Sequence, residues 1–411
     1  MGPPRRLMGY TAPMSQAQPF FKQLPGDRIY WMGVLIVLCF VSVFLFRSQS
    51  AASYPTYFLA ILMLFTAKQW ADVFQTQFVR WIAALTLWLC ASAFWSDPFV
   101  WQDALSVWIR GVLVFLFVVA VAECQLRGQM QRWMSKAVAL VGAAAMAVAL
   151  VNFLVTDPAD GRLNGMGQLD THVIAALVYG VVLLFALRLA LGEKGVMWRW
   201  CALAAVVLAV VCIALSDSRT AWVSVALGVV TYILAAKSND ARQLLLAITA
   251  IGVIGGVVLL VFVVNDATRE VILPRGDSFR LAIWSEILQR YFDAPFVGLG
   301  ITTSDDVVVG SVTMDHAHNL YLSLLHQGGA VALVLYLVTV GYAFRAAIVH
   351  FVHEDAKIAI ALLVLASSAF ALDGHELIDK VGEAWFLVWL PIGICLGLNW
   401  AHLIQPEIEE A

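Results

Sequence analysis

Charged residues are scarce in this sequence. Only 13% of the 411 residues are Asp, Glu, Lys or Arg, whereas 62% are hydrophobic and the mean hydropathy is +0.85. Soluble domains carry about one quarter charged residues, so this composition excludes an ordinary soluble domain and favours an all-α, polytopic membrane protein. The formal net charge of −3 is too small to indicate nucleic acid as a partner.

Paired cysteines and the common catalytic signatures are also missing. All six cysteines lie in or at the ends of apolar runs, and none forms a Cys-x-x-Cys pair. Neither a disulfide framework nor a zinc site is therefore indicated. The sequence contains no Walker A, HExxH, GxSxG or protein-kinase signature, no repeat of fixed period and no low-complexity stretch.

Apolar runs long enough to cross a bilayer occupy most of the chain. Such a run needs about 17–25 residues. We identify twelve, near residues 30–46, 53–67, 79–95, 105–122, 137–155, 173–191, 200–216, 221–236, 244–264, 319–344, 357–372 and 384–402. The run at 53–67 is the weakest, because Tyr54-Pro55 interrupts its start.

Twelve spans place both ends of the chain on one side, and the basic residues indicate which side. With residues 1–29 inside, 16 of the 25 Lys and Arg residues fall on inner segments, as the positive-inside rule requires. Residues 1–29 hold no compact apolar core with a cleavage site, so we expect a cytoplasmic tail and no signal peptide. The chain then divides into that tail, nine spans (30–264), a long outer loop (265–317), three spans (318–403) and a second cytoplasmic tail (404–411).

The outer basic residues are almost all arginines. Eight of the nine are Arg; the set is Arg47, Arg110, Arg162, Arg219, Arg269, Arg275, Arg280, Arg290 and Lys380. The planar guanidinium binds phosphate through two parallel hydrogen bonds and keeps its charge, so these residues could form a polyphosphate site. The alternative is that arginine merely tolerates the membrane interface well by snorkelling.

One amphipathic helix is predicted inside the long loop. Residues 279–292 place apolar side chains at helical spacing, with Ser278 as a candidate N-cap and Pro295 as a stop. Arg280 then lies in the first turn, where the helix dipole disfavours a cation. A bound anion would explain this position, although a solvated arginine fits as well. Residues 298–300 (Gly-Leu-Gly) form a flexible turn and lack the pattern of a phosphate loop.

The residues best suited to catalysis follow this loop, in Met314–Leu322 (MDHAHNLYL). His318 is the candidate general base, because a neutral imidazole accepts a proton near pH 7; a purely structural role at the start of the next helix is the alternative. Asn319 and Tyr321 could hold the imidazole or contact sugar hydroxyls, whereas His326, deeper in the helix, is expected to be packed or paired. His316 and His318 could chelate a metal, but no third ligand stands at the expected spacing, so no metal is predicted.

Other outer turns contribute candidate partners. Arg219 lies in the tight turn SDSRTAW between two apolar runs, where a charge indicates function unless Asp217 or a later acid neutralises it. Arg162 lies in a Gly-rich loop that could be a simple turn. Acids also cluster between the last two spans: Asp373, Glu376, Asp379 and Glu383, together with His375. They could orient His318 or act as the base, but we favour a role in neutralising the outer arginines.

Taken together, these motifs resemble the O-antigen ligase and polymerase superfamily. The resemblance rests on SDSRTAW (216–222), on the segment from Arg280 to Gly300, and on HAHNLYLSLLHQGG (316–329), which is its most specific part. It implies a C-type glycosyltransferase fold in a bacterial inner membrane, with the active site on the periplasmic side. By motif, the functional arginines of the family fall on Arg219 and Arg280 and its histidine on His318; Arg162 and Arg47 match less well. The extra His316 departs from the family pattern.

The resemblance also implies a reaction. A glycan would move from undecaprenyl pyrophosphate to a hydroxyl of the lipid A–core oligosaccharide, without metal or cofactor. His318 would take the hydroxyl proton, and Arg219 and Arg280 would stabilise the leaving pyrophosphate. An O-antigen polymerase and a pilin-type protein ligase would share this chemistry with another acceptor. A lipid-linked glycan transporter is a different alternative, but transporters usually carry polar or broken helices near mid-membrane, whereas these charges lie at one rim.

Overall fold

A computed structural model describes residues 28–64, 73–237, 280–309, 312–314, 316–374 and 376–404. Its regular secondary structure is helical apart from one small hairpin. Its helices are α1 (Arg28–Leu45), α2 (Gln49–Ala52), α3 (Tyr54–Leu64), α5 (Gln77–Ser92), α6 (Trp101–Leu126), α7 (Ser135–Thr156), α8 (His172–Gly192), α9 (Val196–Leu215), α10 (Arg219–Lys237), α13 (Arg280–Tyr291), α14 (Leu320–Val349), α15 (Glu354–Phe370) and α16 (Leu390–Ile404). A 3₁₀ turn, η3 (Ala93–Trp95), and two π-helical turns, η4 (Met130–Met134) and η5 (Trp385–Trp389), extend α5, α7 and α16.

The protein is a multi-pass membrane protein. Eight helices of the described chain are long and apolar enough to cross a bilayer: Arg28–Leu45, Gln77–Trp95, Trp101–Leu126, Met130–Thr156, His172–Gly192, Val196–Leu215, Arg219–Lys237 and Leu320–Val349. Three further predicted spans appear as the shorter helices α3, α15 and Trp385–Ala401. The run at 244–264 lies outside the described residues, so the count of twelve and the C-type fold stay predictions.

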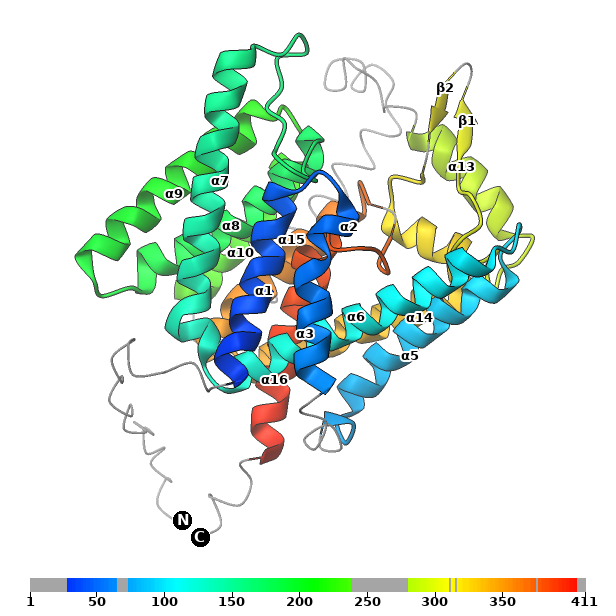
Figure 1. Ribbon diagram of the computed structural model, residues 1–411, viewed down its shortest axis with the longest axis horizontal. Coiled ribbons are helices and arrows are strands. Elements are labelled where there is room, and N and C mark those ends of the chain that lie inside the picture. Colours follow the sequence, from blue (N-terminus) through cyan, green and yellow to red (C-terminus); the bar gives the residue numbers. More distant parts are fainter. Residues whose placement is uncertain are drawn as a thin grey trace, which may run out of the picture.

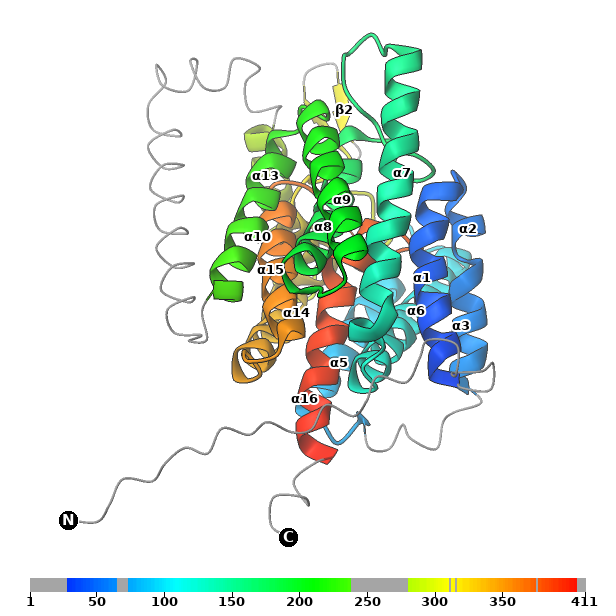
Figure 2. The same ribbon diagram turned by 90° about the vertical axis from the view of Figure 1, so that its left-hand side faces the viewer.

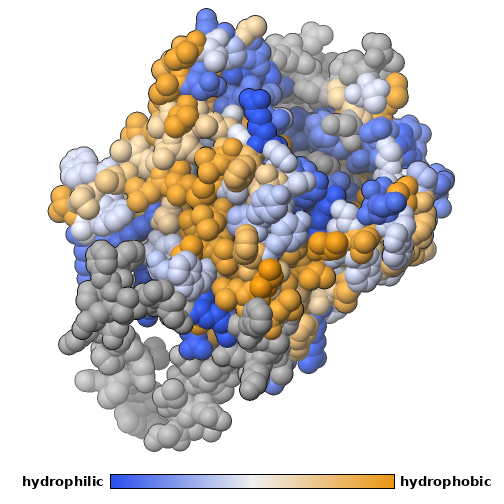
Figure 3. All heavy atoms as spheres, in the orientation of Figure 1, coloured by the Kyte–Doolittle hydropathy of each residue, from blue (hydrophilic) through white to orange (hydrophobic). Residues whose placement is uncertain are grey.

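The helices pack as a bundle in which two of the three most extensive contacts join segments distant in sequence. The pair α10 and α15, the pair α8 and α9, and the pair α6 and α16 make the most extensive contacts (Figures 1 and 2). Small residues allow this approach. The Cα of Gly180 in α8 faces Val225 of α10 and Leu365 of α15, and Gly228 of α10 faces Leu365 and the carbonyl of Ala361. Figure 3 shows hydrophobic residues over much of the middle of one face and hydrophilic residues towards its upper part.

The described part of the long loop is a helix and a hairpin at one end of the bundle. Helix α13 confirms the predicted amphipathic helix, and Ile283 and Ile287 on its apolar stripe are buried. The hairpin, β1 (Val307–Val309) and β2 (Val312–Met314), is antiparallel and was not expected. Val307 and Ala317 join the two isoleucines in a small hydrophobic cluster, which fixes the loop against the start of α14. We call this the outer end, after the orientation predicted above.

Helix α14 is interrupted near its outer end, and the long loop repairs the interruption. Gly329 has φ of 65° and ψ of −166°, which no helix contains. The peptide N–H groups of Leu299 and Gly300 donate to the carbonyls of His326 and Gln327, at 2.7 and 3.0 Å. In return, the N–H groups of Ala330 and Val331 donate to the carbonyls of Pro295 and Phe296, at 2.9 and 3.3 Å. Backbone groups freed by the break are thus hydrogen-bonded by protein, as a low-dielectric surrounding requires. We call these four hydrogen bonds the α14 repair.

The opposite end of the bundle is fixed by buried charge. Asp355, at the start of α15, is fully buried and accepts hydrogen bonds of 2.7 Å from the side-chain amides of Gln125 and Gln131. Arg188 of α8 forms an ion pair with the same carboxylate. Three other elements therefore meet at one carboxylate, which gives the bundle a rigid base on which the outer end is held.

Candidate functional site

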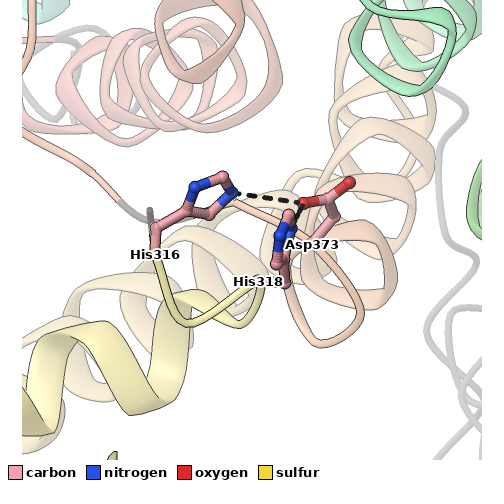
Figure 4. A group of neighbouring side chains, drawn as sticks. All are labelled: His316, His318 and Asp373. Atoms are coloured by element: carbon pink, nitrogen blue, oxygen red, sulfur yellow. Dashed lines mark hydrogen bonds and ion pairs between the residues drawn. The ribbon is translucent and has the colours of Figure 1, made fainter. Parts of the chain in front are cut away.

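Two histidines and an aspartate meet at the outer end. Nδ1 of His318 lies 3.0 Å from Oδ1 of Asp373, and Nε2 of His316 lies 4.0 Å from the same oxygen. The two imidazole rings have centroids 3.9 Å apart (Figure 4). We call His316, His318 and Asp373 the histidine cluster. Its side chains are only 16–27% exposed, so the group is partly shielded from water but still reachable.

The two termini of neighbouring helices hold this cluster in place. Asn319 caps α14: its side-chain oxygen accepts from the N–H groups of Tyr321 and Leu322, and its amide donates to the carbonyl of Ala371 at 3.0 Å. The Tyr321 hydroxyl donates to the carbonyl of Ser367, also at 3.0 Å. Asn319 and Tyr321 therefore bind the backbone that follows or ends α15, and neither holds the imidazole directly. They fix the distance between His318 and Asp373.

His318 itself has an unusual backbone conformation. Its φ is +48°, a left-handed value that costs a non-glycine residue on the order of 1 kcal/mol. The preceding carbonyl, of Ala317, accepts a hydrogen bond of 3.1 Å from the indole of Trp284 in α13. This strained turn aims the imidazole at Asp373 and ties it to the long-loop helix.

The charge of Asp373 is set by its neighbours. Burial alone would raise the pKa of this carboxyl, but hydrogen bonds from His316 and His318 and from the Gly374 N–H hold its pKa well below its usual range. A carboxylate at this position favours the His318 tautomer with its proton on Nδ1, which leaves Nε2 as a proton acceptor. We assign this tautomer from the hydrogen bond between His318 and Asp373.

Arg280 and Arg219 begin helices in the same neighbourhood. Nη2 of Arg280 lies 3.5 Å from Oγ1 of Thr220, the residue after Arg219. Arg219 is exposed at the first turn of α10, where the Ser218 hydroxyl accepts from the N–H of Ala221 at 3.3 Å. Arg280 lies in the first turn of α13, as predicted. Both arginines thus lie in the first turn of a helix, where peptide N–H groups also favour an anion.

Arg162 contacts the turn that precedes Arg219, whereas Arg47 does not. Nε of Arg162 lies 3.7 Å from Oδ2 of Asp217, and its Nη1 lies 3.2 Å from Nε2 of His172. His172 is in turn within electrostatic reach of both Asp217 and Asp373. Arg47 is exposed in the turn between α1 and α2, and in the described chain it makes no hydrogen bond or ion pair.

The acids between the last two spans divide between two roles that the sequence left open. Asp373 binds the histidines, whereas Asp379 forms an ion pair with Arg110 at 3.2 Å. Burial raises the pKa of Glu376 to about 8, with a further contribution from Asp379, and burial raises the pKa of Glu383 to about 7. His375 lies outside the described residues. The buried His326 contributes its carbonyl to the α14 repair and takes no part in the cluster.

A polar cavity of about 320 Å³ lies beside the same loop. Of the residues singled out from the sequence, Arg110 and Glu376 line it, whereas His318, Arg219 and Arg280 do not. Its lining is mainly carboxyl, hydroxyl and amide groups, from Asp103, Val107, Arg110, Ile301, Thr302, Thr303, Ser304, Asp305, Asp306, Gln327, Glu376 and Ile378. Glu376 is three residues from Asp373, so their Cα atoms are at most about 11 Å apart. We call this the outer cavity; groups of this kind are suited to hydrogen bonding with sugar hydroxyls.

Comparison with known proteins gives one family and two relatives. Residues 204–337, which include Arg219, Arg280 and His318, match the O-antigen ligase family. The chain is 25% identical over 321 residues to the O-antigen ligase of Pseudomonas aeruginosa, covering 77% of this chain and 76% of that protein. It is also 25% identical over 301 residues to the exopolysaccharide production protein ExoQ of Rhizobium meliloti, covering 67% of this chain and 66% of that protein.

Proposed function

Because this chain belongs to the O-antigen ligase family, we propose that it is an O-antigen ligase of the bacterial inner membrane. It moves a glycan from undecaprenyl pyrophosphate to a hydroxyl of the lipid A–core oligosaccharide on the periplasmic side. The proposal is carried by the carboxylate-bound imidazole of His318 on a segment hydrogen-bonded to Trp284 of α13, together with Arg280 in the first turn of α13 and its contact with Thr220, next to Arg219 in the chain. That arrangement supplies a base and an anion site, which are the two things such a transfer needs.

The base acts on the acceptor. Nε2 of His318 takes the proton of the acceptor hydroxyl while the oxygen forms a bond to the anomeric carbon of the donor. The bond from that carbon to the pyrophosphate oxygen breaks, and undecaprenyl pyrophosphate leaves with the electron pair. Asp373 keeps its negative charge and stabilises the imidazolium, as a carboxylate partner does in a catalytic triad. General base catalysis of this kind contributes about 10²–10⁴-fold.

The arginines act on the donor. Negative charge grows on the pyrophosphate as it leaves, and fixed donors are most effective where charge develops. Arg219 and Arg280 supply guanidinium groups, the first turns of α10 and α13 supply peptide N–H groups, and Arg162 lies close enough to Asp217 to belong to the same rim. Arg47 stays a weaker candidate for this site.

The outer cavity is our choice for the acceptor sugars. It borders the loop that carries Asp373, and its carboxyl and hydroxyl groups can bind neutral sugar hydroxyls. Replacing Asp305 by Asn should raise the KM for the acceptor and leave the KM for the lipid-linked donor unchanged. A rise confined to the donor KM would place the acceptor elsewhere.

A second candidate keeps the chemistry and changes the acceptor. The relative in Rhizobium meliloti is named for exopolysaccharide production, which supports a polymerase that extends a growing glycan; a protein ligase is the remaining variant. Deleting the gene separates them in cells. Ligase loss leaves O-antigen on the carrier lipid, whereas polymerase loss leaves single-unit caps on the core.

The direct test is transfer by purified protein in nanodiscs. A lipid-linked donor and lipid A–core acceptor are incubated with chelator present, and wild type is compared with His318→Ala, His316→Ala and Arg219→Ala. The proposal expects transfer by wild type and loss of it in His318→Ala and Arg219→Ala. Full activity in His318→Ala together with loss in His316→Ala would move the base to His316, and abolition by chelator would refute a metal-free reaction.

A further inference from the structure

The histidine cluster has a second chemical capacity, because its three members come from two separate segments and face one point. One nitrogen of each imidazole and one carboxylate oxygen of Asp373 all lie within 4.8 Å of one another (Figure 4). The sequence suggested no metal because a third ligand was missing near His316 and His318. That ligand comes from 55 residues downstream of His318.

The spacing suits a small tetrahedral ion. With ligand bonds of about 2.0 Å, two ligands of tetrahedral Zn²⁺ lie about 3.3 Å apart. The two separations given above, 3.0 and 4.0 Å, fall on either side of this value. Imidazole nitrogen and carboxylate oxygen are both ordinary zinc ligands, and three protein ligands leave a fourth position for water. Modest side-chain rotations would complete the site.

The surroundings keep the ligands in position before any ion arrives. Asn319 joins the segment after His318 to the backbone before Asp373, and the N–H of Gly374 donates to the Asp373 carboxylate at 2.8 Å. Groups held in this way lose little freedom on binding. The partial exposure of the three side chains gives an ion access from the outer side.

We propose that His316, His318 and Asp373 form an inhibitory Zn²⁺ site. The inhibition follows from the tautomer of His318, and this part rests on the proposed function. In the free cluster Nδ1 carries the proton and Nε2 accepts one. A zinc ion bound through Nδ1 of a neutral imidazole leaves the ring proton on Nε2, so that atom can no longer accept the proton of an acceptor hydroxyl. The ion also takes Asp373 away from its role beside the imidazolium.

Zinc binding is tested first without any glycan donor. Full-length protein without a polyhistidine tag is stripped with chelator, exchanged into nanodiscs and titrated with ZnCl₂ by calorimetry, with bound zinc counted by elemental analysis. Removing a residue that only hydrogen-bonds to a metal ligand weakens metal binding about 10–100-fold. Removing a ligand itself, as in His316→Ala or Asp373→Asn, should therefore weaken zinc binding at least about tenfold. His353→Ala, at the opposite end of the bundle beside His350, is the matched control and should bind as wild type does.

The outcome decides the proposal. Wild-type affinity and stoichiometry in both His316→Ala and Asp373→Asn would overturn the site, and His316→Ala suffices if Asp373→Asn does not fold. Transfer is then measured with and without ZnCl₂; zinc should lower it and chelator should restore it. Zinc bound to the cluster without loss of transfer would overturn the inhibitory role. Zinc bound in a protein that never transfers glycan would refute the proposed function and leave the metal site standing.

Discussion

Replacing Asp373 by Asn should remove most of the base catalysis without disturbing the shape of the site. The amide has the size of the carboxylate but no charge, and it can present an N–H to Nδ1 of His318. That N–H favours the tautomer whose proton sits on Nε2, which is the wrong atom. The charge that would stabilise the imidazolium is lost as well.

The magnitude follows from the geometry. At the 3.0 Å separation of Nδ1 and Oδ1, a unit charge pair is worth about 5.5 kcal/mol with an effective dielectric constant of about 20. A tenfold rate change corresponds to about 1.4 kcal/mol, so the upper limit is between about 10³ and 10⁴. Because the side chains are 16% and 27% exposed, water weakens the pair. The loss also cannot exceed what a general base contributes, about 10²–10⁴. We expect kcat to fall by about 10²–10³-fold.

The assay is the reconstituted transfer reaction, with product resolved by gel mobility, on Asp373→Asn, His318→Ala and the double variant. Since the two side chains act as one unit, the double variant should be no slower than His318→Ala alone. Asp379→Asn is the matched control, because this acid in the same loop binds Arg110 and no histidine. If Asp373→Asn keeps more than about a tenth of the wild-type kcat, the base assignment of His318 supported by Asp373 is wrong.

Three further predictions test other parts of the molecule. Arg280→Ala should lower kcat about 10²–10³-fold in the same assay by removing a charge from the pyrophosphate site; Arg290→Ala, whose guanidinium binds Glu286 in the same helix, should not, and equal losses would remove Arg280 from the site. Gly329→Ala should destabilise the protein by at least about 2 kcal/mol in chemical unfolding, because its φ is positive and a Cβ would lie 2.3 Å from the Phe296 carbonyl. Gly341→Ala, where a Cβ meets nothing within 4 Å, is the control, and equal stability of the two variants would contradict the α14 repair. Glu376 holds a proton in the folded state that the unfolded chain releases above pH 4.5, so its contribution to stability is lost as the pH rises towards about 8. Glu376→Gln should therefore flatten the decline in melting temperature over this range, and an unchanged pH profile would contradict the raised pKa.

Hydropathy and periodicity were enough to predict most of the helices. Apolar length alone placed the long spans, and the apolar stripe of residues 279–292 predicted α13 within one residue at each end. The hairpin at 307–314 was missed because its strands are three residues long, too short to show a period. The break in α14 was missed as well. A Gly-Gly pair in an apolar run does not indicate whether another segment will form hydrogen bonds with the backbone groups that a break exposes.

The partners within the site were harder to predict than its members. His318, Arg219 and Arg280 were predicted as site residues from their motifs, and their roles stay predictions. The sequence analysis assigned the acids of residues 373–383 to the arginines as a group. Helix α14 has 30 residues and α15 has 17. If residues of the two helices are paired outward from the turn that joins them, Asp373 therefore does not fall opposite His318. Their contact depends on the bond from Asn319 to Ala371, which only the fold reveals. The third metal ligand was missed for the same reason.

The exchange of hydrogen bonds between α14 and residues 295–300 makes a surface segment and a transmembrane element one mechanical unit. Local unfolding of either segment would break the four hydrogen bonds between them, and water would not replace these bonds. We therefore expect the amides of Leu299 and Gly300 to exchange hydrogen as slowly as those of the bundle interior. A displacement of the segment after α13 would therefore also displace α14 within the bilayer. Conversely, a tilt of the inner half of α14 would shift α13 and, with it, Arg280.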